Sequence, residues 1–153
     1  MDISGKTFTA MSDHTSSQSY GLYVLMGLIL FQGLSGIFGG IALVADPTGE
    51  LLQMPVSMLD GSPFEDFLVP GIILLIILGI FPSVVFYGLW KRRSWAWLGS
   101  LLVSAALIIW IGVEIWMAGY HPEPPLQLAY GALGLILMGL IFLPSVRNNS
   151  IGY

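Results

Sequence analysis

The chain contains no cysteine and only two histidines. Without cysteine it has no disulfide, no thiolate nucleophile, no iron–sulfur cluster and no thiolate zinc site. The histidines are His14 and His121. The apolar stretches and charges of the chain predict a membrane topology that places them on opposite sides, which excludes a haem held by two histidines of one subunit. No histidine-based metal motif occurs either. We therefore expect no cofactor and no metal centre.

Charged residues are also scarce. They make up 9% of the 153 residues, whereas apolar residues make up 56%, and ordinary soluble domains are roughly 25% charged. No basic surface is available for nucleic acid, so that class of partner is excluded. The length allows one compact unit. A chain of this composition is typical of an integral membrane protein.

Long apolar stretches divide the chain into regular segments. Each has about 20 residues or more, enough to cross about 30 Å of hydrocarbon as a helix. The predicted fold is an all-α, four-helix transmembrane bundle with up-down-up-down topology, spanning 20–146. The expected helices are near 20–44, 67–90, 95–119 and 126–146. Residues 1–19 are predicted to form a flexible polar tail and 147–153 a short cytoplasmic tail.

The positive charges indicate the orientation of these helices. All five lie outside the apolar stretches, at alternate ends of them: Lys6, Lys91, Arg92, Arg93 and Arg147. Because Lys and Arg next to membrane helices stay cytoplasmic, both termini are expected in the cytoplasm. Seven of the nine acids fall at the opposite, outer end. The connection 91–94 is so short that the helices on either side of it must be antiparallel neighbours.

The outer connection 45–66 carries readable local signals and is predicted to form a structured cap. Asp46-Pro47-Thr48-Gly49 has the residue preferences of a type I turn. Ser62-Pro63-Phe64-Glu65 matches a capping box, which predicts that the second helix starts there. The apolar stretch between them is interrupted by Pro55 and is too short to cross a membrane, so it is expected on the bundle end or in the interface.

Glu114 is the one ionisable residue inside an apolar stretch. A carboxylate at this place predicts a functional site by default, with Trp110 one helical turn away on the same face. One interpretation is a carboxylate at the base of an outward-open cavity. The other is an interfacial Glu hydrogen-bonded to the outer loop. The candidate ligand-binding residues are Glu114, Trp110, His121, Asp46 and Asp66.

Four polar residues lie near the middle of the predicted helices: Gln32, Ser35, Ser83 and Ser104. Pro82, beside Ser83, lacks a backbone N–H and leaves the carbonyl of Leu78 without its usual partner. These polar groups could line a substrate path, or they could hydrogen-bond between helices.

Glycines are frequent, and Gly33, Gly36 and Gly40 fall on one face of the first helix. Small residues let helix backbones approach closely. This face is expected to pack within the bundle, or to contact a partner membrane subunit or a second copy of the chain.

Several of these features occur together in a known group of proteins. Leu59-Asp60-Gly61-Ser62-Pro63-Phe64-Glu65-Asp66-Phe67, the Asp46–Gly49 turn and Trp110–Ile115 resemble small prokaryotic four-helix membrane proteins of unknown function, loosely similar to the DoxX-like families. The resemblance covers about residues 33–120. It implies a bacterial or archaeal inner membrane, and some DoxX-like proteins are similar to membrane subunits of quinone-reducing oxidoreductases.

Three functions follow as expectations. The first is a non-catalytic accessory or scaffold subunit of a membrane complex. The second is binding or transport of a small apolar, quinone- or lipid-like ligand in an outward-facing pocket near Glu114 and Trp110. The third is a quinone-linked oxidoreductase subunit, the one enzyme reading that remains.

Overall fold

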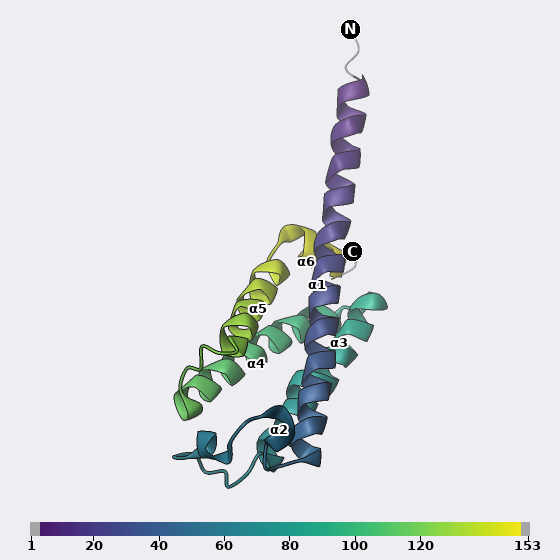
Figure 1. The fold of residues 1–153 in the computed structure, drawn as a ribbon. Helices are drawn as coiled ribbons and strands as arrows, with labels where there is room; N and C mark the ends of the chain where they lie inside the picture. Colours follow the sequence, from purple (N-terminus) through teal and green to yellow (C-terminus); the bar gives the residue numbers. More distant parts are fainter. Residues whose placement is uncertain (1–3, 151–153) are drawn as a thin grey trace.

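The structure is a computed structural model that describes the backbone of residues 4–150 and the side chains of residues 20–148. These residues form helices and connecting turns, with no strand among them (Figure 1). The predicted flexible tail at 1–19 lies outside the described side chains and stays a prediction.

Three helical segments are long and apolar enough to cross a membrane. The first is the apolar part, Tyr20–Ala45, of helix α1 (Ser4–Ala45). The second is a continuous helix, Leu68–Trp90, and the third is α4 (Trp95–Ala118). The prediction of long apolar helices that could cross a membrane is confirmed for these three segments. Their bounds agree with the predicted ones to within a residue or two, apart from the earlier start of α1.

The second segment changes its winding along its length. It begins as α2 (Leu68–Ile73), continues as a π-helix, η3 (Leu74–Ile80), and ends as α3 (Phe81–Trp90). The wider turn ends just before Pro82, whose ring cannot donate a hydrogen bond to the preceding turn. Pro70 lies in the first turn, where a missing N–H is tolerated.

The fourth apolar helix is shorter than predicted. Helix α5 (Leu126–Ile141) has 16 residues, and a separate short helix, α6 (Pro144–Ser150), follows a break at residues 142–143. The predicted end at residue 146 is therefore wrong. Pro144 is the cause, because it cannot donate to the carbonyl of Leu140 and disfavours a helical residue before it. Leu143 donates to that carbonyl instead, at 3.1 Å.

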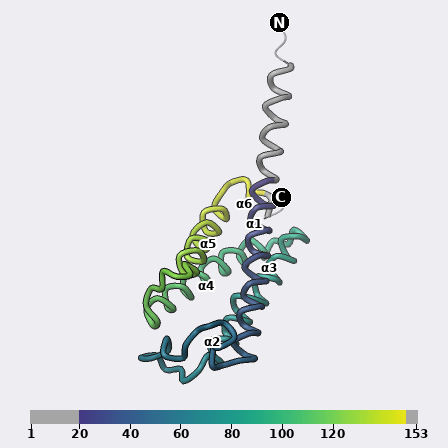
Figure 2. Tube along the Cα trace, viewed as in Figure 1, coloured from purple at the N-terminus to yellow at the C-terminus, as the bar shows by residue number. Residues whose placement is uncertain are grey.

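The helices pack in a closed order, each against two neighbours. Helix α1 packs along the second segment, α3 and η3 pack on α4, α4 packs on α5, and α5 returns to α1 (Figures 1 and 2). Phe31 and Tyr130 join the last pair by ring stacking, with centroids 6.4 Å apart. Helix α6 packs on α1 near Gly21.

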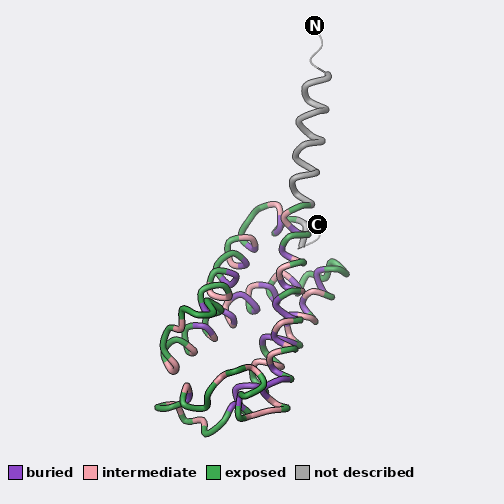
Figure 3. The backbone as a smooth tube through the Cα atoms, viewed as in Figure 1, coloured by how far each residue is buried: buried purple, intermediate pink, exposed green. Residues whose placement is uncertain are grey.

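The interior of this arrangement is apolar, and so is much of its outside. Buried apolar residues form a cluster that draws on α1, the second segment, α4, α5 and α6, and Figure 3 marks the buried positions along these helices. Large apolar side chains also cover the outer helix faces, among them Phe38 at 71% and Trp116 at 82% exposure. Outward apolar side chains along helices of this length are what a lipid environment requires.

The glycine face of α1 is covered by the second segment of the same chain. A Cβ added at Gly36 would lie 2.0 Å from the backbone oxygen of Leu78, and one added at Gly40 would lie 2.5 Å from the Cβ of Leu75. Gly33 is equally crowded, by Ser83. Of the two uses considered for this face, the structure shows packing within the chain.

The outer connection folds into a cap with its own small core. Two short 3-10 helices, η1 (Glu50–Leu52) and η2 (Val56–Leu59), surround the buried side chains of Leu43, Leu59 and Phe67. The turn at Asp46 is confirmed by the hydrogen bond from Gly49 N–H to Asp46 O at 3.1 Å.

The predicted capping box is wrong. The helix begins at Leu68, six residues after Ser62, and Ser62 Oγ accepts a hydrogen bond from the N–H of Phe64 at 3.2 Å. Asp66 lies two residues before the helix start, and its Oδ1 accepts from the N–H of Leu68 at 2.9 Å.

Candidate functional site

Glu114 and His121 are joined at the outer end of α4 and α5 by a residue that the sequence did not single out, Gln127. Gln127 is buried, with 6% of its surface exposed. Its Nε2 donates to the carbonyl of Gly119 at 3.1 Å and to Glu114 Oε1 at 3.4 Å. Its Oε1 accepts the backbone N–H of His121 at 2.9 Å. One amide side chain therefore connects α4, the outer loop and α5.

The local sequence explains this geometry. Helix α4 ends at Ala118 and is followed by Gly119, whose positive φ of 77° is not helical. The chain then turns back through a proline-rich loop to α5. Gln127 is the second residue of α5, so its side chain lies beside the last turns of α4. Trp110 lies one turn below Glu114, close enough for its indole to interact with the carboxylate.

The contacts of Glu114 are those of the second interpretation, a half-buried carboxylate hydrogen-bonded through Gln127 to the outer loop. Glu114, Trp110 and His121 lie at the same end of the molecule, where Gln127 bonds to the carboxylate of Glu114 and to the backbone N–H of His121. A ligand role for the three remains a prediction.

Asp46 and Asp66 belong to the cap instead. Oδ1 of Asp46 accepts from the hydroxyl of Thr48 at 2.6 Å and from its N–H at 3.2 Å, while Oδ2 accepts from the N–H of Leu51 at 2.8 Å. The hydrogen bond from the Thr48 hydroxyl, followed by that from Leu51, lowers the pKa of Asp46 below its ordinary value. Among the described residues, no group of three His, Asp or Glu side chains is placed to hold a metal.

The four polar residues at mid-depth all donate to backbone carbonyls. Gln32 Nε2 donates to the carbonyl of Leu78 at 3.3 Å, the carbonyl that Pro82 was expected to leave without its usual partner. Ser104 Oγ donates across helices to Gly134 O at 2.9 Å. Ser35 and Ser83 bond within their own helices, to Gln32 O and Gly79 O. Gln32 Oε1 has no partner in the described part of the chain.

A second contact joins α4 and α5 at their other end, near the basic residues. The indole Nε1 of Trp97 donates to the carbonyl of Ile141 at 3.3 Å, at the end of α5. The guanidinium of Arg147 lies 5.9 Å from the Trp97 ring centroid. Trp97 could have been noticed from the sequence as an interfacial tryptophan, but its partner lies 44 residues away.

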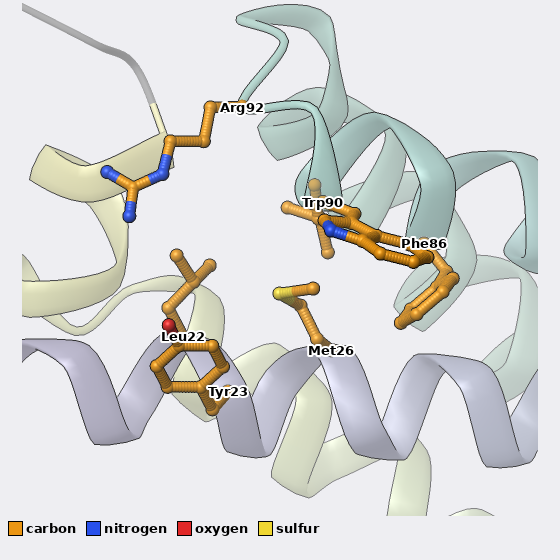
Figure 4. Close-up of a pocket in the computed structure, with 7 residues that line it drawn as sticks. Leu22, Tyr23, Met26, Phe86, Trp90 and Arg92 are labelled. Atoms are coloured by element: carbon orange, nitrogen blue, oxygen red, sulfur yellow. The ribbon is translucent and has the colours of Figure 1, made fainter.

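A hollow lies at this basic end. It opens between α1 and α3 and has a volume of about 420 Å³ (Figure 4). Its lining is apolar apart from Arg92 and the hydroxyl of Tyr23. Sequence reasoning missed it because the two helices that form it are more than 60 residues apart in the chain.

Comparison with protein-family models, with curated proteins and with solved structures finds no match to this chain. The similarity to the DoxX-like families therefore stays a prediction.

Proposed function

We propose that this chain is a non-catalytic integral membrane protein, an accessory or scaffold subunit of a membrane complex. One observation carries the proposal. The polar side chains at mid-depth in the helices, Gln32, Ser35, Ser83 and Ser104, all donate to carbonyls of the chain itself. Gln32 and Ser104 donate across helices, whereas Ser35 and Ser83 donate within their own helices. The donors that could line a substrate path are thus already used by the chain.

The same proposal includes a four-helix transmembrane bundle. Although α5 is short, it is tied to α4 at both ends, by Gln127 to Glu114 and by Trp97 to Ile141. Residues 97 and 114 are separated by about 26 Å of helix, close to the thickness of the hydrocarbon. This supports α5 as a fourth crossing, antiparallel to α4.

The orientation rests on charge. The described Lys and Arg residues lie in the connection 91–94 and in α6, and Arg92 shares a hollow with Leu22 at the beginning of the apolar part of α1. Positive residues next to membrane helices favour the cytoplasm, so both termini are assigned to that side. A bacterial or archaeal inner membrane follows from the resemblance to the DoxX-like families.

The test is native mass spectrometry of gently extracted protein. An accessory subunit is expected to be released with a second, different polypeptide. Recovery as a monomer alone, from several mild detergents, would contradict the proposal, whereas a homodimer would replace the heteromeric partner with a second copy.

Glycines on open surface allow the contact to be located. A Cβ added at Gly27, Gly112 or Gly139 meets nothing within 4 Å. If one of these glycines lies in the contact with the partner, replacing that glycine with leucine should release the partner. Leucine at each of the other two glycines then serves as the matched control. Equal loss at all three would indicate general instability rather than a partner interface.

The alternative is a small apolar, quinone- or lipid-like ligand bound near Glu114, and the position of Glu114, Trp110 and His121 at one end of the molecule favours it. Glu114→Gln keeps the hydrogen-bonding shape and removes the charge. A co-purifying small molecule that is lost in Glu114→Gln, but retained in Glu123→Gln, would support this function. Equal retention in both variants would count against it.

A further inference from the structure

The hollow at the basic end is an apolar groove with one cation on its rim. Leu22 and Met26 of α1 line one side, Phe86, Leu89 and Trp90 of α3 line the other, and Arg92 lies in the loop that follows α3 (Figure 4). Met26 points from α1 toward the rings of Phe86 and Trp90, and the Arg92 side chain extends from the loop toward the side of α1 that carries Leu22.

Arg92 occupies a backbone position that usually belongs to glycine. The N–H of Arg93 bonds to Gly88 O at 2.9 Å and the N–H of Arg92 bonds to Leu89 O at 3.0 Å, which is the Schellman pattern at a helix C-terminus. Arg92 is its left-handed residue, with φ of 50°. An arginine at this position departs from local preference, and such departures are expected where a side chain has a function.

Arg92 differs from Lys91 and Arg147, whose cationic groups lie near aromatic rings, and from Arg93, which does not line the groove. The ammonium of Lys91 lies 5.9 Å from the Tyr87 ring centroid, and Arg147 lies against Trp97. In the part of the chain that the structure describes, no acidic side chain pairs with Arg92. Its guanidinium therefore lines the groove as an unpaired cation.

We propose that this groove binds one anionic phospholipid of the cytoplasmic leaflet. The acyl chain would lie along Leu22, Met26 and Phe86, and the phosphate would meet the guanidinium of Arg92, which suits a phosphate by its planar donor geometry. Trp90, next to the rim, is a residue type enriched at the level of lipid headgroups. Cytoplasmic leaflets carry the anionic lipids, so an apolar groove with its cation on that side matches such a lipid at both ends.

The experiment compares phosphatidylglycerol with phosphatidylcholine of identical acyl chains, titrated onto delipidated protein and counted by native mass spectrometry. The wild-type protein should retain one phosphatidylglycerol in preference to phosphatidylcholine. Arg92→Gly should reduce this preference about five-fold or more, and it keeps the backbone geometry because glycine adopts a positive φ readily. Arg93→Gly, with the same change of charge one residue away, should retain the preference.

Met26→Trp tests the apolar part separately, since it fills the groove and leaves Arg92 in place; it should also lower retention. Three results would overturn the proposal: equal losses in Arg92→Gly and Arg93→Gly, equal binding of the two lipids by the wild type, or full retention in Met26→Trp. Displacement of the lipid by millimolar inorganic phosphate would likewise overturn it, because it would assign the site to a free anion.

Discussion

Gly36→Ala should separate α1 from the second membrane segment. The added Cβ would lie 2.0 Å from the carbonyl oxygen of Leu78, and contacts below 3.0 Å essentially do not occur, so the helices must move apart by about 1 Å. A gap of that size forfeits roughly a quarter to a half of each dispersion contact. Overpacking of this kind costs about 1–3 kcal/mol, and stretching the Gln32–Leu78 bond loses about 0.6–2 kcal/mol more. Adding the two ranges, we expect a total loss of about 1.6–5 kcal/mol, with relaxation of the helices favouring the lower part of that range.

Two other glycines of α1 provide a graded control. A Cβ added at Gly27 meets nothing within 4 Å, and one added at Gly39 lies 3.2 Å from a flexible methyl group of Leu74. Gly27→Ala should leave stability unchanged or raise it slightly, because alanine favours a helix over glycine. Gly39→Ala should fall between the two.

The assay is unfolding by increasing sodium dodecyl sulfate in mixed micelles, followed by circular dichroism and tryptophan fluorescence. Gly36→Ala should unfold at a clearly lower detergent fraction than Gly27→Ala. If the two variants unfolded together, the close approach of α1 to Leu78 would not stabilise the protein, and the packing argument would be refuted.

Three further predictions concern the two ends of the molecule. Gln127→Ala should release the outer loop and cost about 0.5–1.5 kcal/mol for each of its bonds to His121 and Gly119, because both groups are accessible enough for water to replace part of the loss. Hydrogen exchange at residues 119–126 should speed up, and unchanged exchange would contradict this prediction. The hydrogen bonds that lower the pKa of Asp46 stabilise the cap at neutral pH, and this contribution is lost as the pH falls through the lowered pKa; thermal unfolding of Asp46→Asn should lack that pH dependence, and Asp60→Asn should keep it. A single cysteine at Thr48 should react with an impermeant maleimide from outside the cell and one at Ser94 from inside, and reversed labelling would refute the orientation.

The helical spans could be predicted from the sequence because they depend on composition summed over about 20 residues. No single contact decides whether Trp95–Ala118 is a helix. Proline effects could also be predicted, since they are local: the carbonyl of Leu78 lacks a donor from Pro82 and is found bonded to Gln32. The end of α5 was missed by the same kind of reasoning, because the apolar run through Phe142 and Leu143 was given more weight than Pro144.

The capping box failed because tertiary contacts outweighed a local motif. Phe67 is buried with Leu43 and Leu59 under the cap, and its N–H donates to Pro47 O at 2.9 Å. A helix starting at Ser62 would carry Phe67 into a helical turn and break that contact. The segment before Leu68 therefore connects the cap to the helix, and Ser62 closes a tight turn instead.

Of the side chains near the outer end of α4, Glu114 and Trp110 were predicted from the sequence and Gln127 was not. Glu114 and Trp110 lie on one face of α4 because they are four residues apart in a helix. The position of Gln127 beside them depends instead on how tightly the chain turns between Gly119 and Leu126. A lone amide in the first turn of an apolar helix was the available signal. Gln127 is buried, with 6% of its surface exposed. Its position at the start of α5, rather than the fact that it is a glutamine, was the useful signal.

Charged side chains at the two ends of the molecule differ in the contacts that they make. At the outer end, Asp46, Asp66 and Glu114 all accept hydrogen bonds from the chain itself, so a cationic ligand would have to displace bonds that already exist. At the basic end, Arg92 lines an open groove and has no acidic partner in the described chain. A ligand anion meets no competitor there. We therefore place the proposed lipid site at the basic end, in the groove beside Arg92. Glu114→Gln and Arg92→Gly test the two ends against each other in one lipid-retention measurement, and loss of retention in Glu114→Gln alone would reverse this conclusion.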